Sequence, residues 1–374
     1  MLFNVCALYI KIMNNENQTI HKSDDNLTIY GWNEKLNQLK QESIYSTLAH
    51  GRVSIVHRTC YEVISGNGLF QCELTGNMMY GKSDDELPCT GDWVIFQPFD
   101  EHKGIIVDSL PRERTLYRKK SGTVADKQAI ASYVDKAFIV QSLDDNFNVR
   151  RVERFMVQIM EENISSVLVL NKADLDFDRQ SVEEQIKHIS SQIPVFFTSI
   201  HQPETIVRLR KSISEGETVV FVGSSGVGKS SLVNALCEKS VLLTSDISLS
   251  TGKGRHTSTR REMVLMDSSG VLIDTPGVRE FGLAIDNPDS LAEVLEISDY
   301  AELCRFKDCK HINEPGCAVI EAVNSGALDS KVYASYLKLR REAWHFSASE
   351  HEKRKKEKSF TKLVEEVKNR KANR

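Results

Sequence analysis

Short segments in which polar and apolar residues alternate fill the chain between about residues 49 and 114. Gly, Asn and Asp separate these segments, as is typical of turns between β-strands. About five short strands within roughly sixty residues predict a small closed or partly open β-barrel, and the OB-fold is the commonest unit of this kind. The strands that we expect are 52–57, 61–64, 69–74, 92–96 and 104–107.

The pattern changes after residue 115, where unbroken apolar runs alternate with helical patterns up to about residue 285. Such runs are typical of strands in a parallel sheet that is covered on both faces. Their alternation with helices predicts an α/β domain. We assign 137–140, 167–170, 218–222 and 271–274 to its sheet.

A chain of 374 residues suggests two or three domains. We expect an N-terminal extension at 1–47, the barrel at 48–114, the α/β domain at 115–285 and a mainly α-helical domain at 286–374. The first ten residues are largely apolar but lack the basic flank and cleavage site of a signal peptide. No apolar run approaches the length of a membrane span, so we expect no membrane partner. The lack of a secretory signal, together with the nucleotide site described below, leads us to expect a cytoplasmic protein. Either Met1 or Met13 could be the start.

The segment Gly223-Ser-Ser-Gly-Val-Gly-Lys229-Ser230 matches the phosphate-binding loop pattern G-x-x-x-x-G-K-[ST]. It lies between the predicted strand 218–222 and a helical pattern at 231–236, whereas a simple Gly-Ser turn would not need these flanks. Lys229 would reach the β and γ oxygens, and the Ser230 hydroxyl would coordinate Mg²⁺. The candidate phosphate-binding residues are Gly223, Ser224, Ser225, Gly226, Val227, Gly228, Lys229, Ser230 and Ser231.

A second motif, Asn171-Lys172-Ala173-Asp174, follows the predicted strand 167–170. Polar side chains at the carboxyl end of a buried strand are well placed to bind a ligand. An Asp in this position can accept the N1 and N2 protons of guanine, which adenine cannot supply. Thr198 and Ser199 follow a further short apolar stretch and would lie beside the base, while Ile200 stands where GTPases usually carry Ala.

The predicted strand 271–274 ends at Asp274, whose carboxylate could hold Mg²⁺ through water, and Gly277 could turn its N–H toward a γ-phosphate. Segment 252–259 contains several hydroxyls, and we expect Thr257 to bind the Mg²⁺, with Thr259 as the next candidate; a solvated loop is the alternative. Val278 stands where many GTPases carry a water-orienting Gln, so we expect slow intrinsic hydrolysis. His256 is a catalytic candidate alongside Lys229, although it could equally contact RNA or nothing.

These motifs occur in an unusual order. An ordinary small GTPase has its phosphate loop first, whereas here the base motif precedes the phosphate loop and the metal motif follows it. The order is circularly permuted, which a fold tolerates when the joined ends lie close together. The chain therefore leads from the metal motif directly into the C-terminal domain.

Three cysteines and a histidine lie within fourteen residues of that domain, at Cys304, Cys309, His311 and Cys317. This spacing suits a tetrahedral zinc site, and four protein ligands leave no open position for water. The zinc would therefore be structural; buried thiols beside a chance histidine are the alternative. The other cysteines are scattered, as expected in a reducing cytosol.

The net charge is −4, yet thirteen Lys and Arg residues stand against six Asp and Glu residues from Lys338 to the end. A long basic helix there would suit contact with a nucleic-acid backbone, with a solvated terminal helix as the alternative. Five basic residues of the predicted barrel could also contact phosphates, with a solvated surface as the alternative. These are Arg52, His57, Arg58, Lys82 and Lys103.

Together these features resemble the circularly permuted, ribosome small-subunit-dependent GTPases of the RsgA/YjeQ type. The resemblance covers about residues 48–345 and rests on the permuted order and on segments 254–259, 274–282 and 304–317. It implies a monomeric GTPase that binds GTP and GDP, one structural Zn²⁺, Mg²⁺ with GTP, and the small (30S) ribosomal subunit with its 16S rRNA late in maturation. It also implies stimulation by that subunit and a link to other assembly factors.

This chain departs from the family pattern in its longer N-terminal extension, in Ser258 within a run that is often all threonine, and in Ile200. Two other classes stay open. An enzyme that uses ATP would share the phosphate loop but would not need residues 171–174. A nucleic-acid-binding module could carry a nucleotide site that is only structural.

Overall fold

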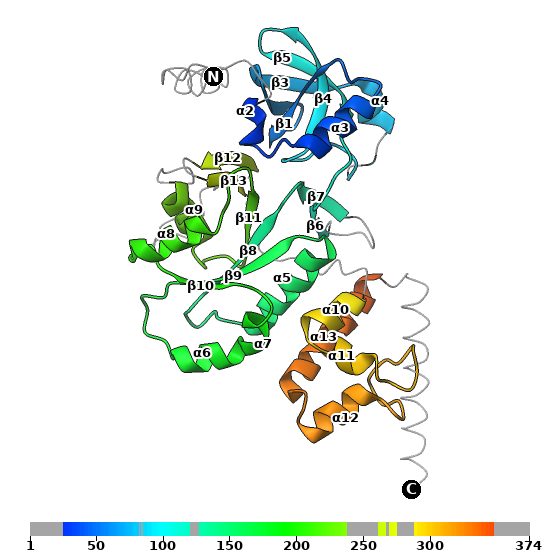
Figure 1. Cartoon of the computed structure of the whole chain (residues 1–374), viewed down its shortest axis with the longest axis vertical. Helices are drawn as coiled ribbons and strands as arrows, with labels where there is room; N and C mark the ends of the chain where they lie inside the picture. Colours follow the sequence, from blue (N-terminus) through cyan, green and yellow to red (C-terminus); the bar gives the residue numbers. More distant parts are fainter. Residues whose placement is uncertain are drawn as a thin grey trace, which may run out of the picture.

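The computed structural model describes residues 25–81, 83, 85–119, 127–237, 261–266, 269–274 and 288–347. Within these ranges a β-barrel, an α/β domain and a helical C-terminal domain follow one another along the molecule (Figure 1). No helix in the described ranges has both the length and the apolar content needed to cross a bilayer.

The barrel is built from β1 (Ala49–Val56), β2 (Tyr61–Ser65), β3 (Gly68–Leu74), β4 (Trp93–Asp100) and β5 (Lys103–Ser109). Its strand order is β1-β2-β3-β5-β4, and β4 pairs with β1 to close it. Only β3 and β5 run parallel, and α4 (Gly76–Gly81) connects β3 to β4. Alternate residues of β2 and β3 point into an apolar interior that includes Val63, Phe70 and Phe96. The predicted OB-type barrel is thus confirmed.

Two short helices, α2 (Asp25–Thr28) and α3 (Glu34–Glu42), pack on the barrel. The Asn33 side chain caps α3 by accepting the Leu36 N–H at 3.1 Å. Trp32 lies edge-on to Trp93 of β4, with ring centroids 4.8 Å apart. The described part of the predicted N-terminal extension therefore packs against the barrel. The domain limits at residues 47, 114 and 285 remain predictions.

The α/β domain has the strand order β10-β9-β8-β11-β13-β12. All neighbours run parallel except β12, which is antiparallel to β13. From β8 the chain moves outward through β9 to β10 and then returns to β11 on the other side of β8. This reversal creates a switch point between β8 and β11, where ligands bind in open α/β sheets. The bounds are β8 (Lys136–Ser142), β9 (Ser165–Asn171), β10 (Val195–Thr198), β11 (Thr218–Val222), β12 (Glu262–Met266) and β13 (Ser269–Asp274).

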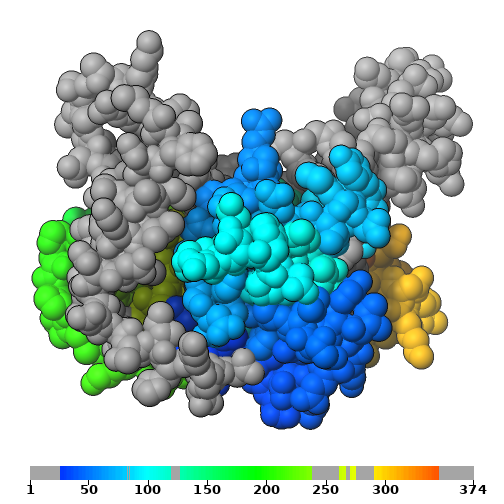
Figure 2. Space-filling model, turned by 90° about the horizontal axis from the view of Figure 1, so that it is seen from above, coloured from blue at the N-terminus to red at the C-terminus, as the bar shows by residue number. Residues whose placement is uncertain are grey.

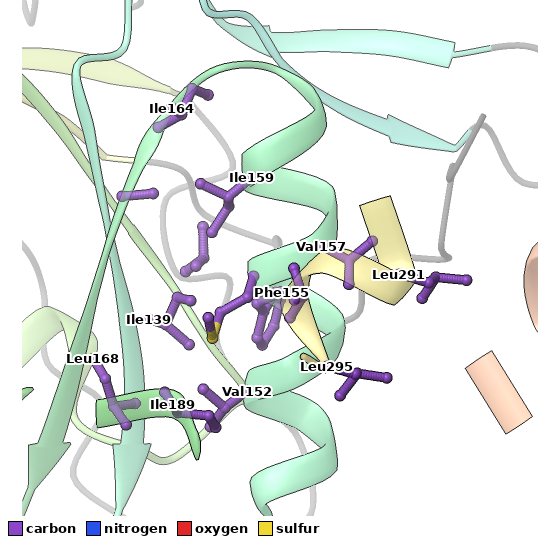
Figure 3. Close-up of a cluster of buried hydrophobic side chains, with 14 of the residues drawn as sticks. Ile139, Val152, Phe155, Val157, Ile159, Ile164, Leu168, Ile189, Leu291 and Leu295 are labelled. Atoms are coloured by element: carbon purple, nitrogen blue, oxygen red, sulfur yellow. The ribbon is translucent and has the colours of Figure 1, made fainter. Parts of the chain in front are cut away.

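Helices cover both faces of this sheet. Phe138 and Val140 of β8 point toward α8 (Pro203–Lys211) and α9 (Lys229–Cys237), whereas Ile139 points to the opposite face. There α5 (Val149–Glu161) packs through side chains three or four residues apart, such as Val152, Phe155 and Ile159 (Figure 3). The short helices α6 (Arg179–Gln185) and α7 (Lys187–Ser190) complete this face, and a small separate sheet of β6 (Leu116–Lys119) and β7 (Lys127–Ala131) precedes β8.

The C-terminal domain packs on the outer side of α5. Leu291 and Leu295 of α10 (Pro288–Val294) and the turn after it join Val157 in one apolar cluster (Figure 3). Arg154 of α5 also pairs with Glu342 of α13 (Ser330–Ser347) at 2.8 Å. The other helices are α11 (Ser298–Ala301) and α12 (Ala318–Ser325), and most of the predicted basic tail lies outside the described residues.

The barrel and the α/β domain share a continuous sheet. Ile55 of β1 pairs with Glu262 of β12, which produces one sheet of eleven strands. From above, the blue and cyan barrel lies over the molecule between green and yellow segments of the other domains (Figure 2).

Arg52 lies at this junction, and our expectation that it contacts phosphates or faces solvent was wrong. Its side chain is 1% exposed and donates to the carbonyls of Tyr30, Gly91 and Tyr133 and to the hydroxyl of Thr218. Burial lowers the pKa of Arg52 to about 10, with Asp135 opposing this shift, so the group remains charged. The guanidinium therefore joins the barrel to the first residue of β11.

Candidate functional site

The phosphate-binding loop leaves β11 at the switch point and enters α9 at Lys229. Gly228 has φ +92°, and a Cβ on it would come within 2.3 Å of Asn171 Nδ2. A Cβ on Gly223 would lie 2.3 Å from the Val140 carbonyl oxygen. Lys229 Nζ folds back across the loop and donates to the carbonyls of Gly223 and Ser224 at 2.6 and 2.7 Å. The loop therefore requires glycine at these two positions and forms a backbone cradle at a helix N-terminus.

Asn171 connects the predicted base motif to this cradle. It lies at the end of β9, is 4% exposed, and donates from Nδ2 to the Val227 carbonyl at 2.8 Å. Its Oδ1 accepts the hydroxyl of Thr198, at the end of β10, at 3.2 Å. The structure thus brings together three of the predicted segments, each from the carboxyl end of a parallel strand.

Asp174 is exposed beside this network, as a carboxylate that receives a base must be. The Ser199 hydroxyl donates to Asp174 Oδ1, and this hydrogen bond lowers the pKa of Asp174. The Ser199 N–H in turn donates to Thr205 Oγ1 at 3.0 Å. Ala173 N–H donates to the Thr198 carbonyl at 3.0 Å. The carboxylate is therefore oriented and ionised at neutral pH.

Lys172 has φ +62°, and its Nζ donates to Asp144 Oδ2 at 2.8 Å. Burial would raise the pKa of Asp144, but hydrogen bonds from Lys172 and Ser142 hold it at about 2. The aliphatic part of Lys172 is thereby fixed next to the switch point.

Asp274 ends β13, two strands from β8 and directly beside β11. Ser230 and Ser231 lie in the first turn of α9, in the cradle itself. The other predicted metal, catalytic and γ-phosphate residues, Thr257, His256 and Gly277, lie outside the described residues. The roles of the individual residues therefore remain predictions.

The four predicted zinc ligands converge. The ligand atoms of Cys304, Cys309, His311 and Cys317 all lie within 4.8 Å of one another. The Cys304 and Cys317 sulfurs are 3.8 Å apart, and His311 Nδ1 lies 3.5 and 3.4 Å from them. A tetrahedron with Zn–S of about 2.3 Å and Zn–N of about 2.0 Å has edges of about 3.8 and 3.5 Å. The three distances among Cys304, Cys317 and His311 match these edges, and the cluster fits a structural metal site.

The loop around His311 is held by neighbouring groups. His311 has φ +55°, and its carbonyl accepts the Tyr333 hydroxyl at 2.6 Å. The Glu314 carboxylate accepts the N–H groups of Lys310, Ile312 and Asn313. Burial lowers the pKa of His311, which favours the neutral imidazole that binds metals. Burial also raises the pKa of the Cys317 thiol to about 12, so its thiolate needs an adjacent cation.

Our sequence reasoning missed Thr205 and Glu314, which organise the two sites. A hydroxyl in the first turn of a helix and a carboxylate between metal ligands are common acceptors for loop N–H groups. The residue types were therefore visible, but the loop conformations that bring the N–H groups to them were not.

The fold and the two sites define a P-loop GTPase with permuted motif order and a metal-binding C-terminal domain. The family model described as RsgA GTPase matches residues 109–284. A relative from Bacteroides thetaiotaomicron, named small ribosomal subunit biogenesis GTPase RsgA 1, is 76% identical over 96% of this chain and 100% of its own length. A second relative, from Methanosarcina acetivorans, is named small ribosomal subunit biogenesis GTPase RsgA. It is 38% identical over 87% of this chain and 89% of its own length. The chain belongs to the RsgA family of GTPases.

Solved structures are similar as well. YjeQ from Thermotoga maritima aligns with a TM-score of 0.60 and 27% identity over 79% of this chain and 98% of its own. YloQ, described as a circularly permuted GTPase, aligns with a TM-score of 0.61 and 21% identity over 82% and 99% of the two chains and supports the fold alone. An ABC transporter model also matches residues 206–369. That region includes the phosphate loop but not residues 171–174.

Proposed function

We propose that this GTPase acts on the small (30S) ribosomal subunit, binds its 16S rRNA and assists its late maturation, with slow GTP hydrolysis that the subunit stimulates. The 76% identity to a relative named for small ribosomal subunit biogenesis supports the partner. The observation that carries the nucleotide chemistry is the bond from Asn171 to Val227, which joins the base motif to the phosphate loop.

The chain's own residues would divide the work as follows. Asp174, held by Ser199, accepts the two guanine protons, and the backbone N–H groups of residues 223–230 surround the phosphates. Lys229 leaves the carbonyls of Gly223 and Ser224 to meet the β and γ oxygens. Mg²⁺ neutralises phosphate charge when it is bound, and Ser230, Thr257 and Asp274 would hold it directly or through water. Gly277 and His256 would act at the γ-phosphate and the attacking water.

We further propose that the ion in the C-terminal cluster is one structural Zn²⁺, and that the protein works as a cytoplasmic monomer alongside other assembly factors. The ligand spacing supports zinc. All four donors are protein atoms, so a bound ion would have no open position for substrate.

Co-sedimentation tests the partner. Purified small and large subunits are incubated with the protein and GDP or a non-hydrolysable GTP analogue. We expect binding to the small subunit alone, tighter with the GTP analogue. Equal binding to both subunits, or none, would contradict the proposed partner.

Two substitutions test the nucleotide site. Lys229→Ala should abolish phosphate release in multiple turnover, and tight binding without any turnover in the unaltered protein would instead support a structural nucleotide site. Asp174→Asn should exchange guanine for xanthine preference, while Asp176→Asn, at a neighbouring exposed carboxylate, should not. Retention of ATP in place of GTP by the unaltered protein would favour the ATP-using alternative.

A further inference from the structure

A row of directly opposed residues crosses from the barrel to the end of β13. The strand registers pair Gln71 with Glu62, Glu62 with Ile55, Ile55 with Glu262, and Glu262 with Asp274. Opposed residues on antiparallel strands have their side chains on the same face, with Cβ atoms about 4.5–5.5 Å apart. Neighbouring side chains therefore connect the outer barrel to the carboxylate predicted to hold Mg²⁺.

The strand in the middle of this row has a special position in the chain. β12 (Glu262–Met266) follows the segment that contains Thr257 and precedes β13 with Asp274. Among the described strands, β12 is also the one that pairs the α/β sheet with the barrel. A displacement of β1 would therefore move β12. This strand lies in the chain between the segment with Thr257 and the strand with Asp274, both of which we expect to respond to the nucleotide.

The junction is built to transmit such a displacement. Arg52, also on β1, donates to Thr218 Oγ1 at 2.9 Å and to the Tyr133 carbonyl at 3.4 Å, so β1 is attached to the start of β11 as well. These groups are buried and hydrogen-bonded, and packed interiors deform little. The barrel and the nucleotide sheet thus form one body at this point.

Charge adds a second link along the same row. His57 Nε2 lies 2.7 Å from Glu62 Oε1, and both side chains are largely buried. Glu262 is half-buried and lies directly opposite Asp274, whereas Ile55 separates it from Glu62, which is two strands away in the same row. A partner that attracts His57 away from Glu62 leaves the negative charge of Glu62 uncompensated. The electrostatic potential at Glu262 then changes.

We propose that Glu262 is a positioning residue, through which contact of an RNA phosphate with the barrel hairpin at His57 and Arg58 changes the placement of Asp274. This inference rests on the proposed function and concerns how contact with the small subunit regulates GTP hydrolysis. A phosphate that attracts His57 leaves Glu62 without its partner, and repulsion then moves Glu262 against Asp274. Binding of RNA to the barrel would thereby change the position of Asp274, the carboxylate predicted to hold Mg²⁺.

The test compares Glu262→Gln with the unaltered protein. Turnover is measured alone and with saturating small ribosomal subunits, co-sedimentation gives subunit affinity, and the Mg²⁺ dependence of binding to a fluorescent GTP analogue reports on Asp274. We expect the stimulated-to-basal ratio to fall by about two- to thirty-fold. Subunit affinity should stay the same, and the Mg²⁺ midpoint should shift. Glu62→Gln should act in the same direction.

Glu73→Gln is the matched control, because Glu73 is an exposed barrel carboxylate that pairs with Ile105, outside the row. It should leave all three measurements unchanged, and thermal melting of each variant establishes that it is folded. If Glu262→Gln keeps the full stimulation ratio and the same Mg²⁺ midpoint, the inference is wrong. If small subunits do not stimulate the unaltered protein at all, the proposed function itself fails, and the inference falls with it.

Discussion

The two domains that flank the nucleotide sheet are attached to it in different ways. On the barrel side, a strand pair extends the sheet, and the buried Arg52 bonds groups from both sides of the junction. On the C-terminal side, α10 packs on α5 through apolar side chains, and α13 packs on α10. The ion pair between Arg154 and Glu342 lies at the edge of that contact, with side chains 34% and 29% exposed.

This difference separates a rigid junction from one that can be rearranged. Backbone pairing and a buried hydrogen-bonded cation require one geometry, because any shift leaves polar groups without partners. Apolar helix packing tolerates small sliding movements more easily. In a permuted GTPase whose metal motif leads into the C-terminal domain, we expect nucleotide-dependent motion at the second junction and little at the first.

Removal of the metal should have the largest effect, and it should be confined to the C-terminal domain. Structural zinc contributes on the order of 10 kcal/mol in small zinc domains. A chelator, or Cys317→Ser, should therefore unfold residues after about 300 while the barrel melts as before. Metal analysis and limited proteolysis measure this. Equal protease resistance with and without metal would show that the ion does not maintain the domain.

Arg52→Met should lower the free energy of unfolding at the barrel junction by about 3–5 kcal/mol, because three carbonyls and the Thr218 hydroxyl lose a buried donor. Trp32 and Trp93 lie at this junction, so their fluorescence during urea unfolding reports on it, with Trp344→Phe as the background. A loss below about 1 kcal/mol would mean that the strand pairing alone makes the junction rigid.

Leu295→Ala should cost about 2–4 kcal/mol at the C-terminal junction, since Leu295 is fully buried against the α5 cluster. Leu303→Ala, at a side chain that is 74% exposed, serves as the control and should have almost no effect. The midpoint of C-terminal unfolding measures both. Similar midpoints for the two variants would argue that α10 is not held by this cluster.

Arg154→Met should have the smallest effect, below about 1 kcal/mol, and high salt should remove it because the pair is partly exposed. The same substitution is thereby made at both junctions, and for Arg154 the midpoint of C-terminal unfolding is measured, as for Leu295. If Arg154→Met cost as much as Arg52→Met, the two junctions would not differ in the way described.

The cradle and the metal cluster could be predicted because each depends on residues that lie close together in sequence. Gly223 through Ser230 and Cys304 through Cys317 specify their own turns, and ligand spacing alone indicated tetrahedral geometry. Arg52 could not be predicted in the same way. An arginine on a β-strand is usually solvated, and only the carbonyls of Tyr30, Gly91 and Tyr133 make burial of this one favourable.

By itself, the sequence determined the barrel, the permuted α/β sheet, the phosphate loop and the four metal ligands, since local patterns and short spacings encode all of these. Only the tertiary structure decided that β1 pairs with β12, that Asn171 reaches Val227 fifty-six residues away, and that Glu262 lies between Ile55 and Asp274. The physical reason is that register between distant strands depends on how whole domains pack. No local pattern of polar and apolar residues specifies which strand will become its neighbour.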